Sequence, residues 1–460
     1  MYEIDFEHPG KIHFIGIGGI SMSGFAELLH SMGFTITGSD WHESKITRHL
    51  ESLGIQVVYG QKEENITKDL DLVVYTAAVK KTNPEYQEAE RLSLPLMERA
   101  TMVGQVMKNY SSAIAIAGTH GKTTTTSIAS HIFLEAEMDP TISVGGILEA
   151  IGGNIRIGHS EHFITEACEY TNSFLQFFPT VGMILNIEED HMDFFKDLDD
   201  IRHSFHEFAK RIPAHGTLII NADIDHYEEM IEGLTCKVLT YGLENTQADF
   251  TATNIVYDDM GRGAFDAVVN GETKDHFQLS VVGRHNVSNT LACLALASLY
   301  GIDGPTVQRA LTAFHGADRR FEYKGEKNGF TIIDDYAHHP TEIEATLTAA
   351  AKYPHKTLWC AFQPHTYTRT RAFLKEFASS LALADKIILA DIYAAREKDP
   401  GDISSKDLAV ELEKLGKEVH YLGSFEEIEK FILKNLVNGD LLITMGAGNI
   451  VDIGENLLKA

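Results

Sequence analysis

The stretch Gly118-Thr-His-Gly-Lys-Thr-Thr124 is the part of the sequence most suited to chemistry, and it lies between an apolar run and an amphipathic segment. In such a loop the backbone N–H groups cradle phosphate oxygens, a lysine pairs with the β- and γ-phosphates, and a neighbouring hydroxyl can hold Mg²⁺. Lys122 and Thr123 supply these two side chains. The full phosphate-loop pattern has another glycine where Ile116 stands, so the loop is a shortened variant. The motif predicts ATP binding.

A second glycine-rich turn, Gly16-Ile-Gly18-Gly19, follows a predicted strand and opens a predicted helix. Its glycines let the backbone approach a pyrophosphate at a helix N-terminus, and an acid about 20 residues later can accept a hydrogen bond from a ribose or a base. Asp40 stands at that position, whereas Ser21 replaces the last glycine of the fingerprint. The turn predicts a nucleotide diphosphate and does not distinguish NAD from other nucleotides. A tight turn without a ligand is the alternative.

Two acidic clusters, around Glu169 and around His191, lie next to predicted strands. Sites in parallel sheets gather at the carboxyl edge, and carboxylates with an imidazole are suitable ligands for Mg²⁺ beside a nucleotide. Glu169 and His191 are therefore candidate metal ligands. Other acids of this region are expected to be solvated loop residues: Glu188, Asp197, Asp199 and Asp200.

The elements that must position these residues follow an α/β pattern. Short apolar runs alternate with amphipathic stretches, as in buried parallel strands that are covered by helices on both faces. The segment 123–136, for example, places its apolar residues on one helical face. The predicted strands are 11–16, 35–38, 70–76, 113–118, 181–187, 331–334, 386–390 and 441–444.

The length of 460 residues predicts about three domains. We expect a Rossmann-like N-terminal domain (1–107), a central P-loop-type ATPase domain with a mostly parallel sheet (108–316), and a C-terminal Rossmann-like α/β domain (317–460). The alternation and turn signals of residues 251–279 predict an antiparallel appendage on the central domain.

The net charge of −27 repels phosphate backbones and anionic membrane surfaces, so neither nucleic acid nor a membrane is an expected partner. The four cysteines are too sparse for a disulfide framework or a paired-cysteine metal site, which favours a reducing cytoplasm. The N-terminus resembles no secretory signal, and no apolar stretch approaches the roughly 20 residues that cross a bilayer. The protein is expected to be cytoplasmic.

The order of these motifs resembles the Mur ligases of peptidoglycan synthesis over essentially the whole chain. The resemblance rests on the two glycine-rich turns together with Asp190-His-Met-Asp193, Gly283-Arg-His-Asn286, Asp318-Arg-Arg-Phe321 and Asp334-Asp-Tyr-Ala-His-His-Pro340. Phe362-Gln-Pro-His365-Thr-Tyr-Thr-Arg369 and Asp391-Ile-Tyr-Ala-Ala395 resemble the family member that adds the first amino acid.

That resemblance implies an ATP-dependent, Mg²⁺-assisted ligase that joins L-alanine to UDP-N-acetylmuramate through an acyl phosphate, in a pathway that serves cell-wall synthesis, cell shape and division. A monomer or weak homodimer is expected. The ATP site would comprise Gly118, Thr119, His120, Gly121, Lys122, Thr123, Thr124, Asn286 and Arg320. The UDP-sugar site would comprise Gly16, Gly18, Gly19, Ser39 and Asp40. The amino-acid site would comprise Tyr336, His338, His339 and Arg369, and the metal ligands would be Thr123, Glu169 and His191.

Within this scheme Lys122, His338 and Arg369 are the expected catalytic residues, with His338 either the base that deprotonates alanine or a group that only positions it. Two positions depart from the family pattern. Thr366 stands where many relatives have a second arginine, so the alanine carboxylate must depend on Arg369, and an arginine restored there would partly compensate if it points into the same pocket. Phe205 stands where several sister ligases carry a carbamylated lysine, so no such group is predicted.

Three alternatives remain at this level. A recycling ligase that attaches a ready-made tripeptide to the same UDP-sugar would share every ATP motif, although it typically has Phe where Tyr336 stands. An NAD-dependent dehydrogenase would use only the first glycine turn. A non-enzymatic ATP switch would leave the 334–340 segment and Arg369 without a role.

Overall fold

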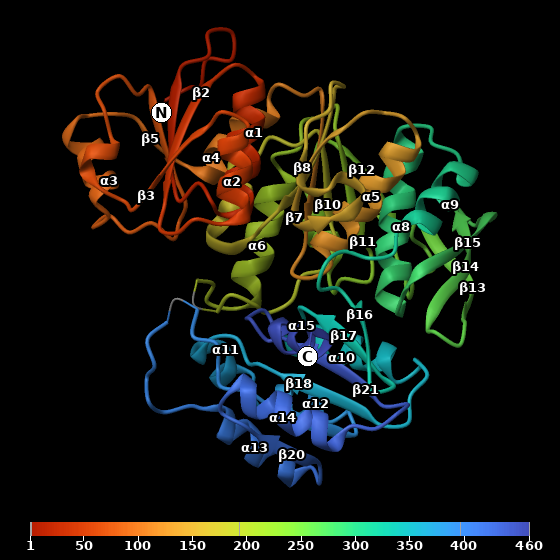
Figure 1. The fold of residues 1–460 in the computed structure, drawn as a ribbon. Helices are drawn as coiled ribbons and strands as arrows, with labels where there is room; N and C mark the ends of the chain where they lie inside the picture. The colour runs from red at the N-terminus through yellow and green to blue at the C-terminus, as the bar shows by residue number, and fades with distance from the viewer. Residues whose placement is uncertain (1, 193, 396, 460) are drawn as a thin grey trace. The chain divides into compact units, whose positions relative to one another are not determined.

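The computed structural model describes residues 2–192, 194–395 and 397–459 (Figure 1). The chain divides into two compact units, which we call the first unit (Met1–Ile187 and Arg202–Leu239) and the second unit (Glu188–Ile201 and Thr240–Ala460). Within the described part of the chain, no helix is long and apolar enough to cross a membrane.

The N-terminal sheet of the first unit has five parallel strands in the order β3-β2-β1-β4-β5. The order reverses between β1 and β4, and in open α/β sheets a ligand binds at the carboxyl ends of the strands beside such a reversal. The glycine turn that begins at Gly16 follows β1 directly. The elements are β1 (Lys11–Ile15), α1 (Ile20–Ser31), β2 (Thr35–Asp40), α2 (Lys45–Ser52), β3 (Gln56–Tyr59), η1 (Glu63–Asn65), β4 (Leu72–Tyr75), α3 (Pro84–Arg91), β5 (Leu96–Glu98) and α4 (Arg99–Met107).

The second sheet of the first unit is built around β6, which pairs in parallel with β9 on one side and with β10 on the other. The loops that follow these three strands therefore emerge at one edge. The elements are β6 (Ser112–Ala117), α5 (Lys122–Glu135), β7 (Thr141–Leu148), η2 (Glu149–Ile151), β8 (Gly153–Arg156), β9 (His162–Ala167), η3 (Tyr170–Gln176), β10 (Val181–Ile184), α6 (Leu198–Ala209), β11 (Thr217–Asn221), α7 (Tyr227–Ile231) and β12 (Lys237–Tyr241).

Helix α1 of the N-terminal sheet packs on the hairpin of β7 and β8, which explains why the two sheets form one unit. The Asn154 amide donates a hydrogen bond to the backbone oxygen of Ile20 at 2.7 Å. Gly24 faces this contact, and a methyl group in its place would approach the Ile155 side chain to 3.1 Å. The absence of a side chain at Gly24 thus permits the close approach of helix and hairpin.

The second unit begins with an antiparallel meander of β13, β14 and β15, followed by two helices. Its C-terminal sheet has six strands in the order β16-β17-β21-β18-β19-β20, all parallel except the pairing of β16 with β17. The elements are β13 (Phe250–Tyr257), β14 (Arg262–Val269), β15 (Glu272–Val282), α8 (Arg284–Leu299), α9 (Gly304–Ala313), β16 (Glu322–Lys327), β17 (Phe330–Asp335), α10 (Pro340–Ala350), β18 (Leu358–Phe362), α11 (Tyr367–Ala372), α12 (Leu374–Leu381), β19 (Lys386–Leu389), α13 (Ser405–Lys414), β20 (Glu418–Tyr421), α14 (Phe425–Asn435), β21 (Leu441–Met445) and α15 (Val451–Lys459).

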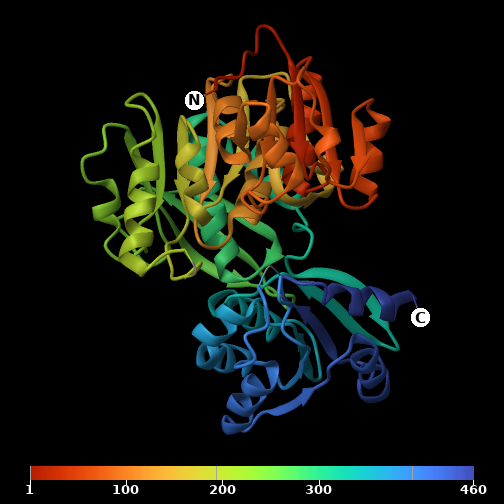
Figure 2. The same ribbon diagram turned by 90° about the vertical axis from the view of Figure 1, so that its left-hand side faces the viewer.

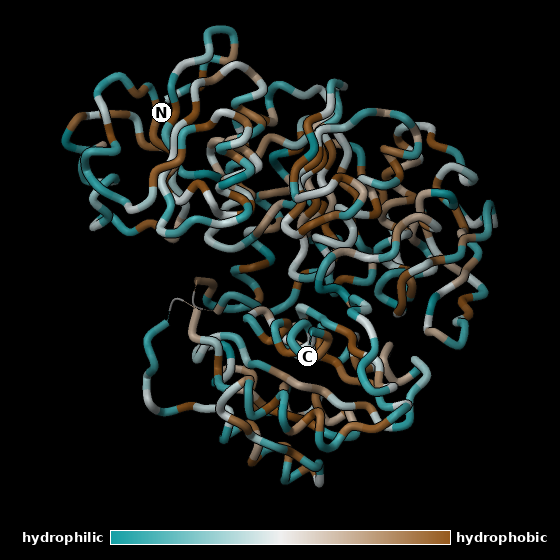
Figure 3. The backbone as a smooth tube through the Cα atoms, viewed as in Figure 1, coloured by the Kyte–Doolittle hydropathy of each residue, from teal (hydrophilic) through white to brown (hydrophobic). Residues whose placement is uncertain are grey.

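Both faces of the C-terminal sheet are buried under helices (Figure 2). Alternate residues of β18 show this: Cys360 packs with the apolar residues of α10, α12 and α13, whereas Trp359 packs with those of α14 and α15. Hydrophobic residues run along the interior strands in Figure 3, as expected for a sheet whose side chains are buried on both faces. The domain is therefore doubly wound.

The predicted α/β class is confirmed, and the antiparallel appendage predicted for 251–279 corresponds to β13, β14 and β15. The sheets are mostly parallel, as predicted, and at two edges the strands β8 and β16 run antiparallel to their neighbours. Both form hairpins across short turns, and such turns require antiparallel strands.

Gly104→Ala should destabilise the first unit. A methyl group on Gly104 in α4 would lie 1.9 Å from the backbone oxygen of Gln176, so helix and loop must separate. Overpacking of this kind typically costs about 1–3 kcal/mol. Calorimetry should show a lower unfolding temperature for this variant. Gly153→Ala is the control, because its methyl group meets no atom within 4 Å, and equal unfolding temperatures for the two variants would contradict the packing described.

Candidate active site

The phosphate loop connects β6 to α5 through two glycines with positive φ, Gly118 (152°) and Gly121 (81°). Asn186, which follows β10, holds the loop from the side: its Oδ1 accepts from the His120 backbone N–H at 2.7 Å, and its amide donates to the His120 oxygen at 3.0 Å. The helix begins at Lys122, so the first N–H groups of α5 lie where the loop ends. Such a helix start binds anions.

Lys122 lies over its own loop. Its Nζ donates to the backbone oxygens of Gly118 and Thr119 and, at 2.9 Å, to Oε2 of Glu169. The two side chains are only 15% and 3% exposed. Burial alone would lower the pKa of Lys122, but the Glu169 carboxylate outweighs burial and the pKa is raised. The lysine is therefore held in its charged form.

Glu169 follows β9, whose Ala167 pairs with Ala117 of β6, so the carboxylate emerges beside the phosphate loop. Thr123 lies in the first turn of α5, and Thr124 behind it is buried. The neighbouring Glu166 fixes β7 instead, because its Oε1 accepts from the backbone N–H of Gly145 at 2.6 Å. Of the two glutamates, Glu169 is the one that faces the loop lysine.

The N-terminal glycine turn is closed by the two residues that end β2. The Ser39 backbone oxygen accepts from the N–H groups of Gly16 (2.8 Å) and Ile17 (2.9 Å), and Asp40 Oδ2 accepts from the Gly18 N–H at 2.9 Å. A methyl group on Gly18 would lie 2.7 Å from that carboxylate oxygen. Asp40 thus shapes the turn itself.

Arg99 lies beside this turn and was not predicted from the sequence. Its Nη1 donates to the Ser21 hydroxyl at 2.7 Å, and burial lowers its pKa. Ser21 is the residue that replaces the final glycine of the fingerprint. Arg99 is the first residue of α4 and lies 78 residues after Ser21, so no local sequence pattern predicts this contact.

Three of the residues predicted to bind the amino acid form one cluster in the second unit. The Tyr336 and His338 rings lie 5.4 Å apart, and the His338 and His365 rings 5.7 Å apart. His365 Nδ1 lies 3.0 Å from Nη1 of Arg369. His365 had no predicted role, although it joins the other residues.

Arg369 is also paired with a carboxylate of the protein. Its Nη2 and Nε donate to Asp190 Oδ1 at 2.7 and 3.3 Å, and both side chains are at most 10% exposed. Burial raises the pKa of Asp190, but Arg369 and His191 outweigh it and hold the pKa well below its usual range. His191 Nε2 lies 3.8 Å from Asp190 Oδ2. The predicted metal ligand His191 is thus a neighbour of this ion pair.

The orientation of His338 is fixed from one side. Its Nδ1 lies 3.0 Å from the Tyr336 backbone oxygen and 3.2 Å from Glu342 Oε2, and both of these oxygens are acceptors. Nδ1 therefore carries the hydrogen and Nε2 the lone pair. The Arg320 guanidinium lies 5.2 Å from the centre of the Tyr336 ring and 4.0 Å from Glu342.

Two predicted site residues have contacts that shape helices. His339 Nδ1 accepts from the Thr341 N–H at 3.4 Å and caps α10, and its Nε2 donates to the Glu189 oxygen at 3.0 Å. Asn286, at the start of α8, donates to the Val282 oxygen at 2.8 Å and is buried. These contacts are structural and assign a ligand to neither residue.

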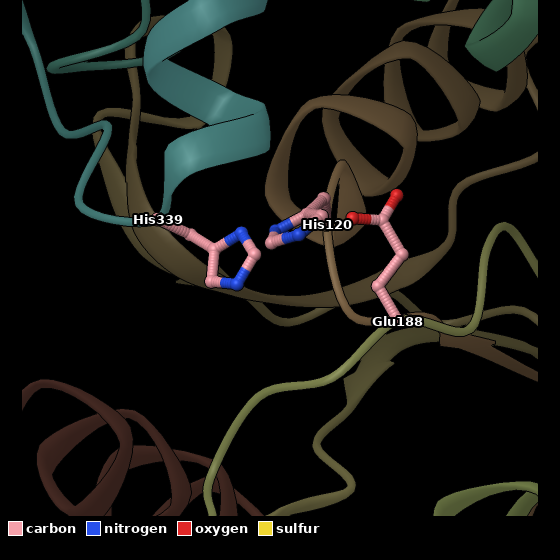
Figure 4. A group of neighbouring side chains, drawn as sticks. All are labelled: His120, Glu188 and His339. Carbon is pink, nitrogen blue, oxygen red and sulfur yellow. The ribbon is translucent and has the colours of Figure 1, made fainter. Parts of the chain in front are cut away.

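Glu188 was expected to be only solvated, and that expectation was wrong. Its Oε2 accepts from the Thr341 hydroxyl at 2.7 Å, and a carboxylate oxygen lies within 4.8 Å of a ring nitrogen of His339. Figure 4 draws these two side chains of the second unit and, from the phosphate loop of the first unit, His120. The contact between Glu188 and Thr341 joins residues 153 positions apart, and the acidic segment around Glu188 gives no indication of it.

Phe205 and Thr366, the two departures from the family pattern, both have structural contacts. Phe205 is fully buried against the Phe174 ring, with the ring centres 5.2 Å apart, so this position has no room for a charged group. Thr366 has a φ of 65°, and its hydroxyl accepts from the Arg369 backbone N–H at 3.4 Å, which caps α11.

The comparisons with known proteins agree over nearly the whole chain. Three family models match: "Mur ligase family, catalytic domain" at residues 11–111, "Mur ligase middle domain" at 116–297, and "Mur ligase, glutamate ligase domain" at 319–448. UDP-N-acetylmuramate–L-alanine ligases from Lachnoclostridium phytofermentans and Agathobacter rectalis are 58% and 59% identical, each over 100% of both chains.

Solved structures give the same result at lower identity. A UDP-N-acetylmuramate–alanine ligase from Thermotoga maritima is 29% identical, with a TM-score of 0.83 over 98% of both chains. A murein peptide ligase from Psychrobacter arcticus is 27% identical, with a TM-score of 0.73 over 98% of both chains.

Thr366→Arg should lower stability, because it removes the hydroxyl that caps α11. Loss of such a cap costs about 0.5–2 kcal/mol. We expect a lower unfolding temperature in calorimetry, whereas Thr366→Ser, which keeps the hydroxyl, should stay close to the parent protein. An arginine variant as stable as the serine variant would show that the cap contributes nothing.

Proposed function

Because the chain belongs to the Mur ligase family, we propose that it is an ATP-dependent ligase that joins L-alanine to the lactoyl carboxylate of UDP-N-acetylmuramate. The observation that carries the proposal is its full-length similarity to ligases of that name. The reaction would proceed in two steps, with an acyl phosphate formed first and displaced by the amine second. The product would be a peptidoglycan precursor, made in the cytoplasm by a monomer or weak homodimer whose domains end near residues 107 and 316.

ATP would bind at the phosphate loop, 118–124, with Lys122 and the first N–H groups of α5 on its phosphates. Asn286 is proposed for the adenine side of the nucleotide, and Arg320 is proposed as a further ATP-binding residue. A phosphate group offers Lys122 the same kind of acceptor that the loop carbonyls and Glu169 now provide. Phosphoryl transfer depends mainly on positioning and on neutralisation of charge, which a buried, charged lysine supplies.

The oxygen donors beside the loop are suited to Mg²⁺. Glu169 offers a carboxylate shortly after β9, and Thr123 offers a hydroxyl in the first turn of α5. Hard oxygen ligands of this kind are what Mg²⁺ prefers. We propose these two residues as ligands of one ion and His191 for a second. The bound ion would neutralise charge that develops on the transferred phosphoryl group.

The UDP-sugar would bind at the N-terminal glycine turn through Gly16, Gly18, Gly19, Ser39 and Asp40. The turn lies at the reversal of strand order, and the first N–H groups of α1 follow it directly. A pyrophosphate fits such a helix start.

The amino acid is assigned to the cluster of Tyr336, His338 and Arg369, with His339 beside it. Because Glu342 and the Tyr336 oxygen hold Nδ1–H of His338, its Nε2 is free to take a proton from the alanine ammonium, and the Glu342 carboxylate would stabilise the resulting imidazolium. Nη1 of Arg369 contacts His365 and Nη2 donates to Asp190, and each of these nitrogens carries a second N–H. These two remaining N–H groups form an edge of the guanidinium that can bind a carboxylate bidentately.

The reaction class is tested by measuring ADP release from ATP in the presence of UDP-N-acetylmuramate. Each member of a panel of amino acids, and the murein tripeptide, is supplied in turn as the acceptor. We expect ADP release with L-alanine. Release only with the tripeptide would instead identify a recycling ligase, and no release with any acceptor would reject the proposal.

Lys122→Ala should abolish turnover and leave UDP-sugar binding nearly unchanged, because the lysine belongs to the phosphate loop and the sugar nucleotide to the N-terminal turn. Isothermal calorimetry with UDP-N-acetylmuramate measures the second part. Lys210→Ala, which removes a surface lysine paired with Glu207, is the control and should keep full activity. Comparable weakening of UDP-sugar binding in the Lys122 variant would contradict the separation of the two sites.

Arg369→Ala should raise the KM for alanine by roughly 10-fold to 100-fold, since a charged hydrogen-bond partner contributes about 1.5–3 kcal/mol. The KM values for ATP and UDP-sugar should change little. Because the variant also leaves Asp190 buried without its partner, the unfolding temperature must be measured in parallel.

Arg371→Ala is the matched control for this test. It lies in the same helix, but its guanidinium pairs with Asp402 at the surface, so the KM for alanine should not change. If Arg369→Ala leaves that KM within about twofold of the parent, the carboxylate is bound elsewhere.

A further inference from the structure

Glu85 is a fully buried carboxylate in the N-terminal sheet region, and none of the roles proposed above uses it. It lies in the first turn of α3, behind the cap formed by Asn83. Among the described residues, no lysine or arginine pairs with it; the basic group beside it is His13, whose Nε2 lies 3.7 Å from Oε1. Burial of a carboxylate is unfavourable unless hydrogen bonds compensate for the lost solvation.

Two short hydrogen bonds join the carboxylate to segments distant in sequence. The Ser39 hydroxyl donates to Oε2 at 2.6 Å, and the Asn65 amide donates to Oε1 at 2.6 Å. Ser39, like Glu85, is 0% exposed. Water is therefore excluded from the Ser39 bond, and hydrogen bonds to charged groups in such surroundings are the strong ones.

Each of these partners is bonded in turn to a loop at the carboxyl edge of the sheet. Ser39 accepts the N–H groups of Gly16 and Ile17 on its backbone oxygen. The Asn65 amide also donates to the Gly60 oxygen at 2.9 Å, and the Gly60 N–H donates to the Asp40 oxygen at 2.7 Å. One carboxylate thus connects the turn after β1, the end of β2 and the residue after β3 with the start of α3.

We infer that Glu85 is a positioning residue for the sugar-nucleotide site, which holds the glycine turn and the end of β2 in the geometry that binds the UDP-sugar. The inference rests on the proposed function for the site itself. Glu85 touches neither substrate nor reacting atoms; it acts through Ser39 and Asn65. Interactions that fix loops before binding increase affinity by lowering the cost of ordering them.

The test compares Glu85→Ala, Glu85→Gln and Asn65→Ala in the full-length enzyme, by steady-state kinetics and by calorimetric binding of UDP-N-acetylmuramate. We expect Glu85→Ala to raise the Kd and KM for the UDP-sugar roughly 10-fold to 100-fold, with kcat and the KM values for ATP and alanine within about twofold. Asn65→Ala, which removes one of the two bonds from a half-buried position, should shift the same two constants by about 3-fold to 10-fold. Glu85→Gln keeps an acceptor for one partner and should restore most of the affinity.

Gln105→Ala is the matched control, because it also removes a buried side chain with two hydrogen bonds, to Ile4 and Tyr2, but none to the loops described here. It should lower the unfolding temperature without changing the KM for the UDP-sugar. If the parent enzyme binds UDP-N-acetylmuramate, and both Asn65→Ala and any folded Glu85→Ala bind it as tightly as the parent does, the positioning role is wrong. A parent enzyme that binds no UDP-sugar would instead reject the proposed function of the site.

Discussion

The phosphate loop depends on one buried ion pair, between Lys122 and Glu169. Burial removes the water that would stabilise the charged form of Lys122, and the Glu169 carboxylate at 2.9 Å stabilises that form instead. The pair also draws the end of β9 to the end of β6, and Lys122 closes the loop on its own carbonyls. Under the proposed function, an incoming phosphate meets a lysine that is already charged and already placed, so little reorganisation is needed in the transition state.

The same principle, a carboxylate holding a functional cation or loop, recurs in the rest of the molecule. Asp190 holds Arg369, Glu342 orients His338, and Asp40 closes the N-terminal glycine turn. In each case the acid fixes the group beside it before any substrate binds. The phosphate loop and the N-terminal glycine turn lie in the first unit, and the cluster proposed for the amino acid lies in the second.

The sequence predicts the parts of the fold that depend on local patterns. The apolar runs around β6 and β1, followed directly by glycines, identify both turns because a strand, a turn and a helix are adjacent in the chain. Contacts between distant segments give no such signal. The pairing of Arg369 with Asp190, the contact of His339 with the Glu189 oxygen and the burial of Glu85 all depend on how distant segments come together. A single sequence does not contain that information in local form.

In the proposed function, the phosphate loop directs the γ-phosphoryl group of ATP onto the carboxylate of the UDP-sugar. The most direct test uses UDP-N-acetylmuramate labelled with heavy oxygen in that carboxylate, with ATP and L-alanine, and mass spectrometry of the phosphate released. An acyl phosphate passes one carboxylate oxygen to the departing phosphate, so labelled phosphate should form in step with the amide. Amide formation with unlabelled phosphate would contradict the account.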